Sequence, residues 1–323
     1  MTNRELIRKS DWAVADLSSG GLLNPEQSNR FVRKLLVQPT LLRSVRSVLM
    51  NSHTMKINKI QFDKRILRPG VEYTPLAEDP GDTGVGRSRP VTEQVELVSK
   101  EQIAEVRLSY DLIEDNIENG DIGLQTSEVS GRPAQGGLKD TIMQLMAERV
   151  ALDLEELAIL GDTGSGDAYL AQLDGYLQQA TANVVNNANA GVSKSLFKAG
   201  VQTMPDQYLR NRTAMRHYLS VDQETSYRDN LGNRETTLGD AQINGTAPVF
   251  GMGTPVEPVS LIPNDQGMFT NPMNLIWGIH RQIHMESDKD ITARAIIIVV
   301  TTRVDFLIEE VEAIVKYTNI GTP

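Results

Sequence analysis

His280 and His284 are separated by four positions, the spacing that brings two imidazoles to one face of a helix and lets them share a metal ion. Apolar and polar residues alternate around both histidines, however, and this alternation indicates a strand. Along a strand, four positions span about 13 Å at ~3.3 Å per residue, which is too far for two ligands of one ion. We therefore predict no metal site at this pair.

Two glycine-rich acidic segments, GDTGVG at 81–86 and GDTGSGD at 161–167, resemble phosphate-binding loops in composition. Neither ends in the Gly-Lys-Ser/Thr of a P-loop, and neither begins a helix whose N-terminus could bind phosphate. The ligand spacing of an EF-hand is missing as well. Both segments are predicted to be turns, and the sequence predicts no cofactor.

Nucleophilic catalysis finds little support in the residue types. The 323 residues include no cysteine, which excludes thiolate catalysis, zinc–sulfur sites, iron–sulfur clusters and disulfides, and which is typical of a reducing cytoplasm. Aromatic residues make up 5%, a low share for a chain built around a deep ligand pocket. No Gly-x-Ser-x-Gly elbow occurs, although a Ser-His-Asp triad needs no fixed spacing, so a soluble hydrolase stays an alternative. We predict that the protein is not an enzyme and has no catalytic residues.

The charge of the chain is unevenly distributed around its net value of −10. Residues 1–70 contain 13 Lys or Arg and 5 Asp or Glu, so the remainder holds 19 basic and 37 acidic side chains. A basic N-terminal segment on an acidic body is expected of an arm that lies on other copies of the chain, the alternative being a solvated tail. The acidic body disfavours a sequence-specific DNA-binding protein.

Neither a membrane span nor a secretion signal is expected. The longest apolar run, 295–300, is far shorter than the ~20 residues that cross a bilayer. The first 21 residues lack the apolar core of a signal peptide. We therefore expect a soluble chain made in the cytoplasm.

The strongest element in the sequence is a helix over 138–160. Apolar residues recur there at spacings of three and four, no proline interrupts the segment, and glycines flank it. At ~1.5 Å per residue the helix would be roughly 35 Å long. The apolar stripe consists of Leu138, Ile142, Met146, Val150, Leu154 and Leu157.

A long hairpin is predicted upstream of this helix. Two alternating segments, 53–76 and 93–108, are joined by a loop at 75–92 that is rich in Pro, Gly and charge. A ribbon of this kind buries too few apolar side chains to be stable alone in water, so we predict that another subunit covers it. Residues 1–52 precede it as an arm, with a short helix that begins near Pro25.

The rest of the chain alternates short helices, loops and strands. Helices are predicted at 110–117, 192–204 (with Ser193 as N-cap) and 222–231, and a glycine-rich connector at 119–137. Strands are predicted at 274–286, 292–303 and 311–319. Because residues 293–302 are apolar on both faces, that strand should be a central one.

Three segments carry a resemblance to a known family: AEVRLSYDLIEDN at 104–116, ERVALDLEELAILGD at 148–162 and IIIVVTTRVDFLIEEVEAIVKY at 296–317. With its order of arm, hairpin, long helix, helical region and late strands, the chain resembles the major capsid proteins of tailed phages, the Hong Kong 97-like capsid fold. The resemblance implies an α+β chain divided into an N-terminal arm (1–52), an extended β-hairpin loop (53–108), a peripheral domain with the spine helix (109–169), an axial α/β domain (170–270), and the return strands of the peripheral domain with the C-terminal strand of the axial domain (271–323).

The function implied by the resemblance is that of a structural subunit. It would self-assemble into the icosahedral capsid shell that encloses the double-stranded DNA genome of a tailed bacteriophage, in the cytoplasm of the host bacterium. The alternative with the same fold is an encapsulin-type shell that holds a cargo enzyme. The implied partners are copies of the chain in hexamers and pentamers, a separate scaffolding protein (since residues 1–52 are too short to include one), a portal, decoration proteins and non-specifically contacted DNA.

Intersubunit contacts are predicted in the arm and at the loop tip, at Arg30, Arg33, Lys34, Glu78, Asp79, Asp82, Arg87 and Arg89. Some members of the family crosslink a Lys of the extended loop to an Asn of a neighbour, with the help of a Glu. Here residues 76–90 contain no Lys, although Asn271 and Asn274 are present as acceptors. We therefore predict no autocatalytic crosslink.

Overall fold

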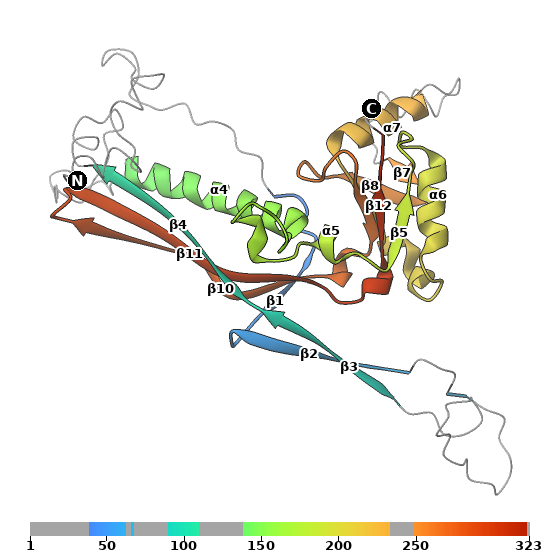
Figure 1. The fold of residues 1–323 in the computed structure, drawn as a ribbon, viewed down its shortest axis with the longest axis horizontal. Coiled ribbons are helices and arrows are strands. Elements are labelled where there is room, and N and C mark those ends of the chain that lie inside the picture. Colours follow the sequence, from blue (N-terminus) through green and yellow to red (C-terminus); the bar gives the residue numbers. More distant parts are fainter. Residues whose placement is uncertain (1–38, 63–65, 68–89, 110–137, 233–248, 322–323) are drawn as a thin grey trace, which may run out of the picture.

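The computed structural model describes residues 39–62, 66–67, 90–109, 138–232 and 249–321. Two sheets form the body, a long helix runs along one of them, and a two-stranded hairpin projects away from both (Figure 1). The predicted short helix near Pro25, the loop tip, the predicted helix at 110–117 and the connector at 119–137 lie outside these residues.

The first sheet has four strands in the order β1 (Arg46–Leu49), β10 (Leu275–Asp290), β11 (Ala295–Ile308) and β4 (Lys100–Ser109). β10 and β11 form a long antiparallel ribbon, and β11 lies between two partners, which confirms the prediction of a central strand. The helix α4 (Leu138–Leu160) has the predicted bounds. Its Ile142 packs against Leu108 and Ile296 of the sheet, and Leu154 and Leu157 are buried in the main core, so the described part of the predicted stripe faces inward.

The second sheet has six strands in the order β5 (Asn183–Asn186), β12 (Ile314–Thr318), β9 (Gly267–Thr270), β6 (Arg216–Leu219), β8 (Thr254–Pro258) and β7 (Phe250–Gly251). Two predicted helices, α6 (Lys194–Thr203) and α7 (Val221–Gly232), pack on it through Phe197 and Tyr227. Ser193 occupies the N-cap position of α6, as predicted, but its side chain caps no backbone amide, and its Oγ lies 2.7 Å from Ser195 Oγ instead.

The remaining elements are short. They are α5 (Tyr176–Gln179) and the 3₁₀ turns η1 (Leu170–Gln172), η2 (Tyr208–Ala214), η3 (Pro272–Asn274) and η4 (Val311–Ala313). The predicted strand at 311–319 therefore begins only at Ile314, after η4.

One apolar core spans both sheets. It includes Leu157 of α4, Phe306 of β11, Ile314 of β12 and Met268 of β9. Gly161 ends α4 where the chain passes very close to itself, since a Cβ there would lie 2.4 Å from the carbonyl oxygen of Leu173. The segment 161–167 is a turn, as predicted, in which Asp162 Oδ1 accepts a bond from the Gly164 amide at 2.8 Å.

The hairpin differs from its prediction in one respect. Its strands β2 (Thr54–Gln61) and β3 (Val91–Val98) pair in register from Thr54↔Val98 to Gln61↔Val91. The predicted single return strand at 93–108 is wrong, because it breaks at Ser99 and its second half, β4, pairs with β11 in the first sheet. The reason is that Val106 and Leu108 pack with α4, a tertiary contact that alternation alone does not reveal.

Candidate functional site at the base of the hairpin

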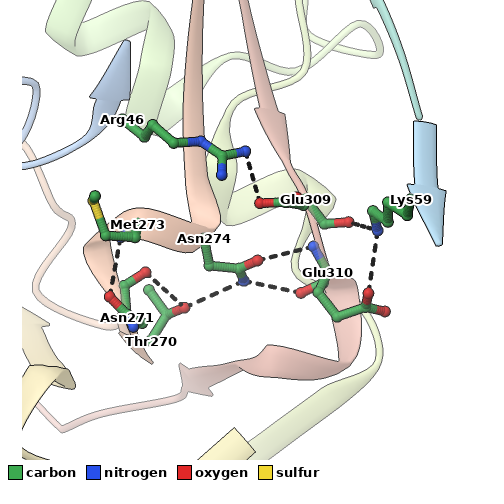
Figure 2. A network of polar contacts seen from close by, with 8 residues as sticks. All are labelled: Arg46, Lys59, Thr270, Asn271, Met273, Asn274, Glu309 and Glu310. Carbon is green, nitrogen blue, oxygen red and sulfur yellow. Dashed lines mark hydrogen bonds and ion pairs between the residues drawn. The ribbon is translucent and has the colours of Figure 1, made fainter. Parts of the chain in front are cut away.

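Two short connections between the sheets lie side by side, and a polar network ties them together. One crossing runs from β9 through η3 to β10, and the other from β11 to η4 and β12. Asn274 in the first crossing accepts a bond from the Glu310 amide on Oδ1 and donates from Nδ2 to the Glu310 carbonyl oxygen, both at 2.9 Å. Figure 2 shows the Asn274 side chain bonded to Glu310 on one side and to Thr270 on the other. The two crossings are therefore held as one joint.

Two basic residues attach other parts of the chain to this joint. Lys59 of β2 forms an ion pair with Glu310 at 3.1 Å and also donates to the carbonyl oxygen of Glu309 (Figure 2). Arg46 of β1 pairs with the carboxylate of Glu309 at 2.7 Å. Only 14% of the Lys59 side chain is exposed, so this contact is stronger than an average surface ion pair. The joint thus sets where the hairpin lies.

A cleft of about 500 Å³ opens beside the joint. Its lining includes Ile60 of the hairpin, Tyr208 of η2 and Met273 of η3. Ile60 is 71% exposed and Met273 is 58% exposed, so apolar surface faces solvent at this place. Burial, with the carboxylates of Glu310 and Glu312, raises the pKa of Tyr208, which keeps its phenol neutral.

A second attachment lies where β3 turns into β4. Asp305 of β11 accepts hydrogen bonds from the amides of Val98 at 2.6 Å and Phe306 at 2.9 Å. The fully buried Ser99 donates its amide to the carbonyl oxygen of His53 at 3.0 Å. Burial raises the pKa of Asp305 to about 6, even though both amide bonds favour the carboxylate.

A small apolar cluster supports this attachment. Met50, Leu97 and Ile276 are buried together there. Gly278 leaves the space for them, since a Cβ on it would lie 3.0 Å from the sulfur of Met50. The hairpin therefore leaves the body from a packed base.

The arrangement binds chain segments to one another. Among the described residues, no group of three His, Cys, Asp or Glu side chains is placed to hold a metal ion. His280 and His284 lie on β10, which confirms the predicted strand. His217 is buried between aromatic rings, where desolvation lowers its pKa to about 3, so it stays neutral. No helix in the described ranges is both long and apolar enough to cross a bilayer.

All of the predicted contact residues lie outside the part of the chain that the structure describes. These are Arg30, Arg33, Lys34, Glu78, Asp79, Asp82, Arg87 and Arg89. The sequence did not single out Lys59, Glu310 or Asp305. Their signal is weak: a Lys within an alternating strand and an acidic pair between two strands are both common surface patterns.

Comparison with solved structures shows which proteins share this fold. The fold is similar over almost its whole length to the capsid of the native GTA particle, with a TM-score of 0.65 at 13% identity over 96% of this chain and 99% of that one. It is also similar to a structure of Microbacterium phage Oxtober96, with a TM-score of 0.59 at 13% identity over 96% and 99% of the two chains. The procapsid of satellite phage P4, which includes the size determination (Sid) protein, matches with a TM-score of 0.58 at 13% identity over 99% and 96%. The fold is that of a phage capsid protein.

The sequence itself is 38% identical over 332 residues to the putative prophage capsid protein YqbE of Bacillus subtilis (strain 168), covering 99% of both chains. This chain belongs to the same family of phage and prophage capsid proteins. No protein-family model matches it. The predicted resemblance to phage capsid proteins is confirmed, the role of the chain is that of a structural shell subunit, and the encapsulin alternative is not favoured.

Proposed function

We propose that the chain self-assembles, through its hairpin, into the icosahedral shell of a tailed phage that encloses double-stranded DNA, and that its fold is the Hong Kong 97-like capsid fold. In this proposal the strands of residues 54–98 form the extended loop, α4 is the spine helix, and residues 170–270 form the axial domain. Residues 100–109 belong with the peripheral sheet, because β4 pairs with β11.

The observation that carries the proposal is the apolar surface of the hairpin. Ile60, Phe62 and Leu67 are 71%, 49% and 85% exposed. Ile60 lies near the end of β2 beside the cleft, and Phe62 and Leu67 follow that strand along the chain. A two-stranded ribbon with exposed apolar side chains is marginal in water, and cover by a second copy makes it stable. Because the hairpin and the surface that receives it differ, such contacts are heterologous and close into rings.

Expression of the chain, alone and together with a scaffolding protein, tests this proposal. Electron microscopy and sedimentation should show capsomers or closed shells, and Ile60→Ser with Leu67→Ser should reduce assembly while the subunit stays folded. Lys56→Ser, an exposed change on the same strand, is the matched control. A wild-type chain that remains a protease-resistant monomer under both conditions would contradict the proposal.

The proposed partners follow from shell assembly. We propose a separate scaffolding protein, a portal and decoration proteins, with assembly in the host cytoplasm. In this proposal Arg30, Arg33 and Lys34 contact a neighbouring subunit or, non-specifically, packaged DNA. The tip residues Glu78, Asp79, Asp82, Arg87 and Arg89 would form ion pairs with a neighbour. Changing Arg87 and Arg89 to Glu should impair assembly of a folded subunit, whereas unchanged shells would contradict the tip contacts.

The contents of the shell distinguish the two alternatives with this fold. Purified particles should contain nucleic acid, which an encapsulin-type shell would lack.

A further inference from the structure

Residues 39–45 form a strap across the body. Leu41, Leu42 and Val45 are buried in the core that spans both sheets. The strap turns back on itself, with the Ser44 amide bonded to the carbonyl oxygen of Leu41 at 2.9 Å. On the side of the second sheet, Ser44 Oγ lies 3.3 Å from the phenol oxygen of Tyr218 in β6. The strap therefore contacts both halves of the molecule.

Glu155 of α4 holds this strap by its backbone. One oxygen, Oε1, accepts hydrogen bonds from three successive amides, those of Thr40 at 2.7 Å, Leu41 at 2.5 Å and Leu42 at 3.4 Å. The residue is 1% exposed. Within the described ranges, no Lys, Arg or His forms an ion pair with it. Converging amide dipoles therefore stabilise the buried charge, as they do in backbone anion sites.

Glu155 contacts only backbone amides of the strap, so the contact depends on the conformation of the strap backbone and not on the side chains of residues 40–42. A carboxylate on a rigid helix accepts bonds from the strap only where three amides point to one spot. If the strap were displaced, the buried carboxylate would lose those amides, which is unfavourable. We infer that Glu155 is the positioning residue that fixes where residues 39–45 lie on the body and in which direction the backbone runs at their start.

The position of the strap can be measured directly because the chain contains no cysteine. Thr40→Cys and Glu148→Cys, both at exposed sites, accept one spin label each. Pulsed electron paramagnetic resonance should give one narrow distance distribution, which Glu155→Ala should broaden or split. Glu156→Gln is the matched control, because its side chain points about 100° away around the helix. It should leave the distribution unchanged.

Amide exchange gives a second readout for the same variants. Exchange at Leu41 and Leu42 should rise by about tenfold or more in Glu155→Ala, since each loses a bond to a charged acceptor. Glu155→Gln keeps the acceptor oxygen without its charge, so its exchange rates at Leu41 and Leu42 should lie between those of the wild type and Glu155→Ala. If Glu155 only filled space, Glu155→Gln would exchange like the wild type. If Glu155→Ala does not fold, the spin-label distances and the amide exchange of Glu155→Gln test the inference instead. An unchanged distance distribution together with unchanged exchange overturns the inference.

The consequence for assembly rests on the proposed function. With the strap misplaced, arms should start in the wrong direction, and the yield of closed shells should fall in Glu155→Ala but not in Glu156→Gln. Wild-type chains that form no shells would contradict the proposed function while the spin-label distances still test the positioning role. Normal shells from a variant with a displaced strap would overturn only the link to assembly.

Discussion

Lys59 Nζ lies 3.1 Å from Glu310 Oε2, so a side chain of the hairpin is held by the segment through which the chain passes from one sheet to the other. Asp305 forms the other attachment by bonding the Val98 amide at 2.6 Å. These two contacts act at different points of the hairpin, one on β2 and one at the end of β3. Together they set its angle to the body.

Lys59→Met should loosen the hairpin while the body stays folded. Methionine keeps the apolar stem but removes the charge that pairs with Glu310, and because both side chains are partly exposed the loss of stability should be only about 1 kcal/mol. Hydrogen–deuterium exchange should therefore rise in 54–61 and 91–98 far more than the melting temperature falls.

Lys56→Met is the matched control for this change, since Lys56 lies on the same strand and is exposed. Glu310→Gln should reproduce the effect of Lys59→Met, and the double variant should add little to either, because the two residues form one contact. Equal exchange in Lys59→Met and Lys56→Met would show that the ion pair does not hold the hairpin.

Asp305 should make the subunit less stable as the pH rises from about 4 to about 6. Its pKa is about 6 in the folded chain against an ordinary value of 3.8, so the folded state binds the proton more tightly. The stabilising contribution is therefore complete below pH 4 and is lost as the pH rises through 6. The wild-type free energy of unfolding should fall by about 2 kcal/mol more than that of Asp305→Asn over this range.

Denaturant unfolding at several pH values measures this difference. Asp288→Asn serves as the control because Asp288 is exposed on β10, and its pH dependence should follow that of the wild type. Parallel curves for wild type and Asp305→Asn would contradict the assignment to Asp305.

The sequence predicted the elements whose burial repeats at a regular period. The apolar stripe of α4 can be buried only against the body, and β11, which is apolar on both faces, can be buried only inside a sheet. The structure shows α4 packed on the sheet and β11 between two partner strands. The break at Ser99 was not predictable in this way, because β3 and β4 alternate alike and differ only in which strand pairs with them. Glu155 was also missed, since its partners are amides some 114 positions away. A helix face with one acidic residue gives no sign of such contacts.

Gly161→Ala should destabilise the subunit by about 3 kcal/mol or prevent folding. The added methyl group would lie 2.4 Å and 2.6 Å from the carbonyl oxygens of Leu173 and Leu157, and backbone atoms cannot move aside as a flexible side chain can. Gly166→Ala in the same turn is the control, because no atom lies within 4 Å of its Cβ position. Thermal unfolding distinguishes the two variants, and similar melting temperatures would contradict the close packing after α4.

Mature particles should dissolve into single subunits on a denaturing gel, without a ladder of covalent multimers. Residues 76–90 contain no Lys to serve as the donor of a crosslink. Lys59, on the described part of the hairpin, forms an ion pair with Glu310 and donates to the carbonyl oxygen of Glu309, so reaction of its amine would first require those contacts to break. The amide group of Asn274 is bonded to the backbone of Glu310 on both sides, so attack on it would first require those bonds to break. Gels of boiled particles and of unassembled subunits should therefore show the same band, and a ladder confined to the particles would prove the prediction wrong.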